Sequence, residues 1–177
     1  DVGCSTGEFL TAIGWEGEKY GMEISPFARD LAEKNGFRFD RDIFSERDFY
    51  DLIVFRGTIQ HIDEPFRFMK FAHTALKRSG YIVFLATPNI NSPYYWVKKT
   101  LPFLDPPRNF YLPDDINLSR ALENFGFEVK LVQFPYLNTP YAQPLKDHFL
   151  FLKNILFKKE YRHAFWRSSM ELIAQKR

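Results

Sequence analysis

The first ten residues of the chain, DVGCSTGEFL, hold two overlapping patterns of residues that could do chemistry. Gly3-Cys4-Ser5-Thr6-Gly7 fits G-x-S-x-G, the nucleophile elbow of serine hydrolases, in which the hydroxyl of Ser5 attacks the substrate. The same segment is also a glycine-rich loop that opens a helix, and such a loop lets the backbone approach a bound cofactor closely. In this second interpretation Ser5 lies beside the cofactor and is not a nucleophile.

Acidic residues near the loop favour the cofactor interpretation. Asp1 lies just before the glycines. Glu23 ends a predicted strand about 20 residues after the loop begins, where nucleotide-binding α/β units carry an acid for the ribose. Asp42 follows the next short strand, where it could bind an adenine amino group. Because the carboxyl ends of parallel strands open onto one crevice, these three acids define a single candidate site.

The hydrolase interpretation has little further support. The elbow of such enzymes follows several strands, and an HGGG-type segment helps to form their oxyanion hole, whereas this sequence has no such segment. Asp147 and His148, or His163, could be nominated as triad partners, but any chain of this size offers such pairs. The pattern G-x-S-x-G alone therefore carries little weight.

The elements that must position these residues alternate between strands and helices. Apolar runs predict strands at 19–24, 37–41, 51–55, 81–86, 127–134 and 169–174, and helical spacing or caps predict helices at 7–13, 25–35, 64–77, 94–100 and 114–124. This order predicts an α/β fold in which helices cover a mostly parallel sheet. A strand normally precedes such a glycine loop, so we expect the first strand of the fold to be missing before Asp1.

Composition places residues 1–177 in one globular domain. The hydrophobic fraction of 45% and the charged fraction of 26% are ordinary for a soluble protein, and a net charge of +2 gives no reason to expect a nucleic-acid partner. The single cysteine, Cys4, excludes an internal disulfide and fits a reducing compartment such as the cytoplasm. No apolar run is long enough to span a membrane, and we expect no metal.

Five segments, in this order, resemble the class I S-adenosylmethionine-dependent methyltransferases: DVGCSTGEFL, GMEIS, FDRDIF, DLIVFRGTIQHI and LKRSGYIVFLATPN. The resemblance covers most of residues 1–135 and is greatest to the small-molecule branch related to ubiquinone-biosynthesis methyltransferases. It implies a Rossmann-like sheet of seven strands with helices on both faces, in which six strands are parallel and the last, at 169–174, is antiparallel. It also implies S-adenosylmethionine as cofactor, S-adenosylhomocysteine as product, and a small-molecule acceptor such as a sugar or a lipid-linked intermediate.

The resemblance further implies roles for residues at matching positions. The glycine loop and the residues after the fourth strand would surround the methionine part of the cofactor. Glu23 and Asp42 would hold the ribose and the adenine amino group, each with the following isoleucine against the ring. The implied cofactor-binding set is Asp1, Gly3, Cys4, Thr6, Gly7, Glu23, Ile24, Asp42, Ile43, Arg56 and Gly57.

Two residues depart from the family pattern and keep other interpretations open. Ser5 stands where a glycine is usual, where it is tolerated if its φ stays negative, and Asn109 stands where a histidine is usual. These departures suggest, as an alternative, a domain that binds the cofactor without turnover. Glu23 would also suit the ribose of a nicotinamide cofactor, but the G-x-G-x-x-G spacing of those enzymes is absent.

One histidine and a long aromatic segment are candidates for acceptor chemistry. His61 follows the fourth strand and could act as general base, since imidazole titrates near neutral pH, or it could brace its loop. Residues 88–112 are rich in proline, asparagine and aromatics and are predicted to form a lid. The candidate acceptor-binding residues in this segment are Asn89, Tyr94, Tyr95, Arg108 and Tyr111.

Residues 140–167 are predicted to be an insertion before the last strand. Within it, 148–159 combines apolar bulk with three lysines, which would suit peripheral contact with a lipid surface. At helical spacing, however, the apolar residues wrap most of the circle, which favours a buried helix or one that forms a homodimer.

Overall fold

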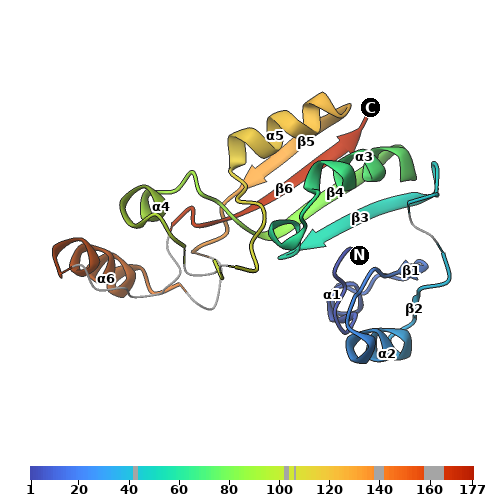
Figure 1. The fold of residues 1–177 in the computed structure, drawn as a ribbon, viewed down its shortest axis with the longest axis horizontal. Coiled ribbons are helices and arrows are strands. Elements are labelled where there is room, and N and C mark those ends of the chain that lie inside the picture. The colour runs from blue at the N-terminus through green and yellow to red at the C-terminus, as the bar shows by residue number, and fades with distance from the viewer. Residues whose placement is uncertain (42–43, 102–103, 106, 138–141, 158–165) are drawn as a thin grey trace.

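A computed structural model of the protein describes residues 1–41, 44–101, 104–105, 107–137, 142–157 and 166–177. Strands and helices alternate along most of the chain (Figure 1). The elements are α1 (Glu8–Ala12), β1 (Lys19–Tyr20), α2 (Pro26–Lys34), β2 (Phe37–Arg38), β3 (Tyr50–Arg56), the 3-10 turn η1 (Ile59–His61), α3 (Pro65–Ala75), β4 (Leu76–Pro88), α4 (Pro93–Lys98), α5 (Asp115–Asn124), β5 (Phe127–Gln133), α6 (Pro144–Phe157) and β6 (Ser169–Lys176).

The larger sheet has the strand order β3-β4-β6-β5. β3 and β4 are parallel, with Ile53 opposite Ile82, whereas β6 is antiparallel to both of its neighbours, β4 and β5. The prediction of an antiparallel last strand is therefore confirmed. β4 begins at Leu76, five residues earlier than predicted, because Leu76 already pairs with Tyr50 of β3.

The prediction of one seven-stranded sheet is wrong for the described residues. They form six strands in two sheets, and the smaller sheet is the parallel pair β1-β2. Val2 lies between the sheets and makes isolated parallel bridges to Met22, just after β1, and to Phe55 of β3. A pair of bridges therefore stands where the predicted sheet would be continuous.

Side-chain caps explain where two of the helices begin. The hydroxyl of Ser25 accepts a hydrogen bond from the N–H of Ala28 at 3.4 Å, and Pro26 occupies the first position of α2. At α5, the carboxylate of Asp114 accepts from the N–H of Asn117 at 2.7 Å. The start of α2 was predicted from Ser25 and Pro26, and the helix at α5 was predicted to begin at Asp114 without reference to a cap.

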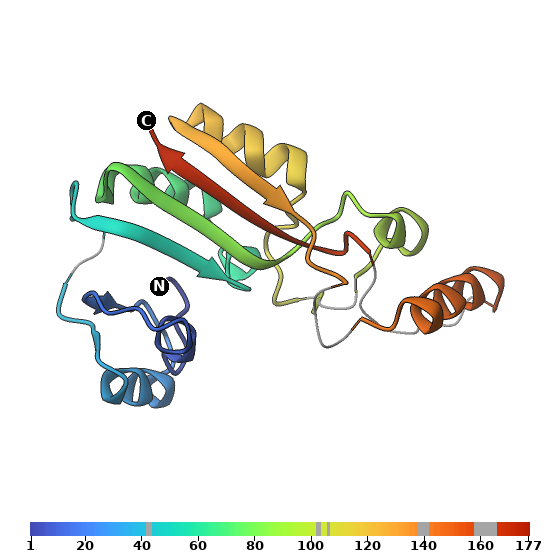
Figure 2. The same cartoon turned by 180° about the vertical axis from the view of Figure 1, so that it is seen from behind.

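Helices cover both faces of the larger sheet, as predicted. α3 and α5 pack on one face, where the stacked rings of Phe55 and Phe84 lie 5.1 Å apart (Figures 1 and 2). On the other face, Val54 packs with Leu10 of α1 and Ala32 of α2. The alternation of Val54 and Phe55 between faces is that of a buried strand.

α4 and α6 lie beyond the end of the larger sheet, on the side away from β1 and β2 (Figures 1 and 2). They pack on each other through a small cluster of buried side chains, Tyr94, Leu101 and Leu104, with Phe151 of α6 against it. Among the described residues, no helix is both long enough and apolar enough to cross a membrane.

Candidate cofactor and acceptor site

The glycine loop has three residues in the left-handed region of backbone space. Gly3, Ser5 and Gly7 have φ values of 74°, 49° and 77°. The expectation of a negative φ at Ser5 is therefore wrong: the loop imposes αL geometry there, and a serine adopts it at some cost. A Cβ added to Gly3 would lie 2.5 Å from Oγ1 of Thr58, and one added to Gly7 would lie 2.6 Å from the ring of Phe37.

Glu23 fastens this loop to the start of α2. Its Oε2 accepts a hydrogen bond from the N–H of Ser5 at 3.0 Å, and its Oε1 accepts from the N–H of Ser25 at 2.8 Å. Each oxygen keeps a further lone pair, so the half-buried carboxylate can still accept from a pair of hydroxyls. The next residue, Ile24, is 96% exposed and offers an apolar surface beside this position.

A crevice of about 120 Å³ opens beside the loop. It is lined by Asp1, Gly3, Cys4, Ser5, Thr6, Glu8, Phe9 and Arg56. Oδ1 of Asp1 is buried without a hydrogen-bond partner, which leaves an acceptor for an ammonium group, and the guanidinium of Arg56 lies 5.7 Å from the centre of the Phe9 ring. These donors and acceptors fit a zwitterionic amino-acid group with an adjoining ribose.

Cys4 turns its side chain into the core. It is buried, and a Cβ on Gly21 would lie 2.7 Å from its sulfur. Burial raises the pKa of the Cys4 thiol to about 11, so the thiol stays protonated near neutral pH. Cys4 therefore contributes backbone to the crevice and no thiolate.

The loop after β3 borders the same crevice. Gly57 has a φ of 61° and donates to the carbonyl of Leu85, which ties the end of β3 to β4. Thr58 follows and packs against Gly3, so the two loops are in direct contact. Sequence reasoning did not single out Thr58, although it lies within the RGTIQHI segment that carried the resemblance. Asp42 and Ile43 lie outside the described residues.

His61 is held by both ring nitrogens. Nδ1 lies 2.9 Å from the carbonyl oxygen of Arg108, and Nε2 lies 3.3 Å from Nε2 of Gln60. A neutral ring that donates from Nδ1 to the carbonyl accepts at Nε2 from the Gln60 amide, so these contacts fix the tautomer. The backbone carbonyl of Gln60 also accepts hydrogen bonds from the N–H groups of Phe110 and Tyr111. The loop after β3 and the end of segment 88–112 are thereby joined.

The candidate acceptor residues fall into two groups. Asn89 and Tyr94 are buried at 0% and 2% exposure, and Oδ1 of Asn89 accepts from the backbone of Asn91 and Asp115. These contacts give Asn89 a structural task. Tyr95, Arg108 and Tyr111 are exposed or half-buried: Lys99 lies over the Tyr95 ring, Arg108 pairs with Asp105, and Tyr111 packs on Phe66.

Asn109 closes the turn that holds Arg108. Its Oδ1 accepts from the N–H of Asp105 at 2.5 Å, whereas its Nδ2 is buried without a partner.

Arg167, which sequence reasoning did not single out, braces the other end of this region. Its guanidinium pairs with Asp115 at 2.9 Å and lies 4.1 Å from the Phe134 ring centre. The only sequence signal for this role was a cation close to the last strand.

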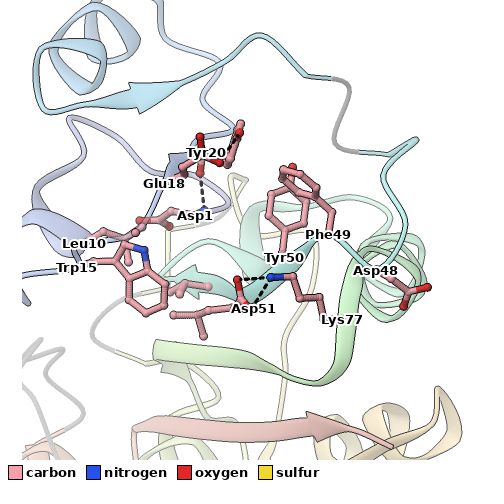
Figure 3. Close-up of a pocket in the computed structure, with 13 residues that line it drawn as sticks. Asp1, Leu10, Trp15, Glu18, Tyr20, Asp48, Phe49, Tyr50, Asp51 and Lys77 are labelled. Carbon is pink, nitrogen blue, oxygen red and sulfur yellow. Dashed lines mark hydrogen bonds and ion pairs between the residues drawn. The ribbon is translucent and has the colours of Figure 1, made fainter.

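Another pocket lies elsewhere, at the amino ends of β3 and β4 (Figure 3). It has a volume of about 360 Å³, and Lys77 pairs with Asp51 across its floor at 2.8 Å. Burial raises the pKa of Tyr50, which also lines it, to about 12. The pocket lies between β1 and β3 next to Asp1, where the two sheets are not joined. It is a different pocket from the crevice beside the glycine loop.

The geometry does not support Ser5 as a nucleophile. In the part of the chain that the structure describes, no side chain hydrogen-bonds to the Ser5 hydroxyl, so a triad is absent there. The described residues also contain no group of three or more histidine, cysteine or acidic side chains arranged to hold a metal ion.

Comparison with protein families identifies the family of the chain. The profile of the family described as "Methyltransferase domain" matches residues 1–132, about three quarters of the chain. The chain belongs to this family. It is a methyltransferase, an enzyme, and its cofactor is S-adenosylmethionine. Among curated proteins, no significant match is found.

Solved structures show the same fold at low sequence identity. An S-adenosylmethionine-dependent methyltransferase from Archaeoglobus fulgidus is 23% identical, with a TM-score of 0.71 over 99% of this chain and 84% of that one. Another from Methanosarcina mazei is 16% identical, with a TM-score of 0.64 over 99% and 90%. The [4+2]-cyclase SpnF is 17% identical, with a TM-score of 0.66 over 99% and 73%. The methyltransferase thus has a Rossmann-like α/β fold.

Proposed function

We propose that this methyltransferase acts on a small-molecule acceptor, such as a sugar or a lipid-linked intermediate, in the cytoplasm. The observation that carries the proposal is the crevice lined by the glycine loop, Asp1 and Arg56, next to the carboxylate of Glu23 that holds the N–H of Ser5. Oδ1 of Asp1 is buried without a hydrogen-bond partner. When bound, S-adenosylmethionine supplies an activated methyl group on a sulfonium. The aromatic and cationic side chains of segment 88–112 supply stacking surface and polar contacts on the acceptor side.

The residues of this chain would divide the binding work along the crevice. Glu23 would accept from the ribose hydroxyls with Ile24 against the adenine, and Asp42 and Ile43 would complete the adenine site. Asp1 would bind the amino group of the methionine part. The rest of the proposed cofactor site would be lined mostly by backbone atoms, with a cation at Arg56. The residues concerned are Gly3, Cys4, Thr6, Gly7, Arg56 and Gly57.

His61 would orient the acceptor side of the site. The contact of Nδ1 with the Arg108 carbonyl leaves Nε2 as the basic nitrogen, and a shift of the Gln60 amide would free it to remove a proton from an acceptor hydroxyl. These contacts and those of the Gln60 backbone carbonyl would hold Arg108 and Tyr111 for the acceptor, and Tyr95 would contribute from α4. We expect a His61→Gln variant to lower kcat if the histidine is a base, and to raise KM alone if it only braces the loop.

The first test of the proposed site is calorimetric titration with S-adenosylhomocysteine and with its 2′-deoxy analogue. Wild-type protein should bind the analogue about tenfold or more weakly, because a carboxylate–hydroxyl contact is lost. Glu23→Ala should bind both ligands weakly and equally, as in a double-mutant cycle. The charge-matched control Glu16→Ala, at an exposed position, should behave as wild type. Equal discrimination by wild type and Glu23→Ala would refute the role of Glu23.

A further inference from the structure

The inner side of α6 is fixed by two residues one turn apart. The buried carboxylate of Asp147 accepts hydrogen bonds from the hydroxyl of Tyr136 and from the N–H of Gln143, the latter at 2.9 Å. Phe151 packs on Tyr94 of α4 with ring centres 6.0 Å apart. These contacts determine which face of the helix points away from the molecule.

The outer side carries a stripe of four apolar residues. Leu145, Phe149, Leu152 and Leu156 are 91%, 64%, 58% and 74% exposed. At about 100° per residue they fall within an arc of about 60°, nearly opposite the inner side. α6 lies at the end of the molecule, beyond α4 and far from the small sheet, so nothing else in the described chain covers this stripe (Figures 1 and 2).

Positive charge borders the stripe. Lys146 and Lys153 lie along one edge of α6, and the single acid of the helix, Asp147, faces inward. A helix with an apolar face, flanking lysines and no outward acid has the composition of helices that lie in a membrane interface.

The neighbouring helix, α4, also carries exposed apolar side chains next to lysines. On α4, Trp96 and Val97 are 58% and 49% exposed, and Lys98 and Lys99 follow directly. Tryptophan is favoured at the boundary between lipid and water because its ring is apolar and its N–H is polar. α4 and α6 contact each other, so both motifs belong to the same end of the molecule.

A second copy of the chain fits this surface less well. If two α6 helices paired antiparallel about a twofold axis, the lysine edge of one would meet the lysine edge of the other and repel it. In a parallel pair, no outward acid on α6 would meet the lysines. Charge complementarity favours an anionic surface instead. We propose that the outer face of α6, with the exposed residues of α4, docks this methyltransferase on membranes that contain anionic lipid.

Vesicle co-sedimentation of the full chain tests the proposal without any methyl acceptor. Wild-type protein should bind phosphatidylcholine vesicles that contain phosphatidylglycerol, and binding should weaken in high salt. Phe149→Ser/Leu152→Ser should lower the partition coefficient at least about tenfold, since two buried apolar side chains are lost. Lys99→Gln/Lys146→Gln should lower it by about fivefold per lysine.

Matched controls distinguish binding through α4 and α6 from non-specific hydrophobic binding and from unfolding of the variants. Ile13→Ser/Leu131→Ser removes two exposed apolar residues outside α4 and α6 and should leave binding unchanged. Each variant should keep the wild-type circular dichroism spectrum and thermal midpoint. The proposal fails if wild type stays in the supernatant, binds neutral vesicles equally, or is unaffected by the α6 substitutions. It also fails if sedimentation velocity shows a dimer that these substitutions dissociate.

Discussion

Gly3 illustrates how single residues shape the proposed cofactor crevice, because it combines a positive φ with a close approach of another loop. A Cβ at this position would lie 2.5 Å from Oγ1 and 3.1 Å from Cβ of Thr58, so rotation of the threonine side chain cannot relieve the contact. Gly14 has a similar φ of 69° but has no atom within 4 Å of its Cβ position. The two glycines therefore separate the cost of backbone conformation from the cost of crowding.

We expect Gly14→Ala to lower the free energy of unfolding by about 1 kcal/mol, the cost of a side chain in the left-handed region. Gly3→Ala should lower it by about 1–3 kcal/mol more because of overpacking. Gly3→Ala should also weaken S-adenosylmethionine binding, whereas Gly14→Ala should not. Urea unfolding and calorimetric titration measure the two effects. Equal destabilisation by both substitutions would contradict the crowding argument.

For single residues, the sequence indicates a role that depends on a local pattern better than it indicates whether the side chain is buried. Glu23 was found because an acid after a strand is a local pattern, and its two hydrogen bonds join the loop and helix that the pattern predicts. Asn89 and Tyr94 were predicted to bind the acceptor, but they are buried by segments distant in sequence. The positive φ of Ser5 likewise depends on the closure of the whole loop rather than on the serine itself.

The position of a helix or strand likewise depends in some cases on neighbouring residues and in others on residues distant in sequence. The start of α2 follows from Ser25 and Pro26, which lie at the helix end that they determine. The start of β4 follows from its pairing with β3, and the orientation of α6 follows from the contact of Asp147 with Tyr136. Helical periodicity showed apolar residues around most of α6, and only the tertiary contact separates the inner from the outer side.

The packing of α3 against the start of β5 makes stability depend on pH through His73. The His73 ring meets the ring of Phe127 edge-on at 5.4 Å. Burial, then the charge of Lys176, lower the pKa of His73, and Asp48 opposes them. Because the unfolded state then binds a proton more readily, the free energy of unfolding should fall as pH drops below about 6.5, the ordinary value for histidine.

A His73→Gln variant tests this dependence. Its free energy of unfolding should change less between pH 7 and pH 5 than that of wild type, while the contributions of the other titrating groups cancel in the comparison. Urea denaturation at a series of pH values gives the two curves. Parallel curves would show that His73 is not linked to folding.

The molecule as a whole consists of two sheets that the backbone joins mainly at one point. The N–H of Val2 bonds to the carbonyl of Val54 at 2.8 Å, and the N–H of Gly3 bonds to the carbonyl of Met22 at 2.8 Å. The proposed cofactor site spans this junction, with Glu23 on the side of the small sheet and Arg56 on the side of the large one. A ligand there should couple the two parts.

Hydrogen exchange should reveal this coupling. Without ligand, amides of the small sheet and glycine loop, such as Gly3 and Met22, should exchange faster than those of β3 and β4, because the small part can open by itself. At about 100 times the dissociation constant, S-adenosylmethionine should slow them about 100-fold, equivalent to about 2.7 kcal/mol, because opening then requires the ligand to leave. The difference in exchange rate between the small sheet and the large sheet should therefore become smaller when the ligand is bound. If the ligand slowed exchange in the large sheet alone, the binding site would lie away from the junction, and the roles of Glu23 and the glycine loop would have to be abandoned.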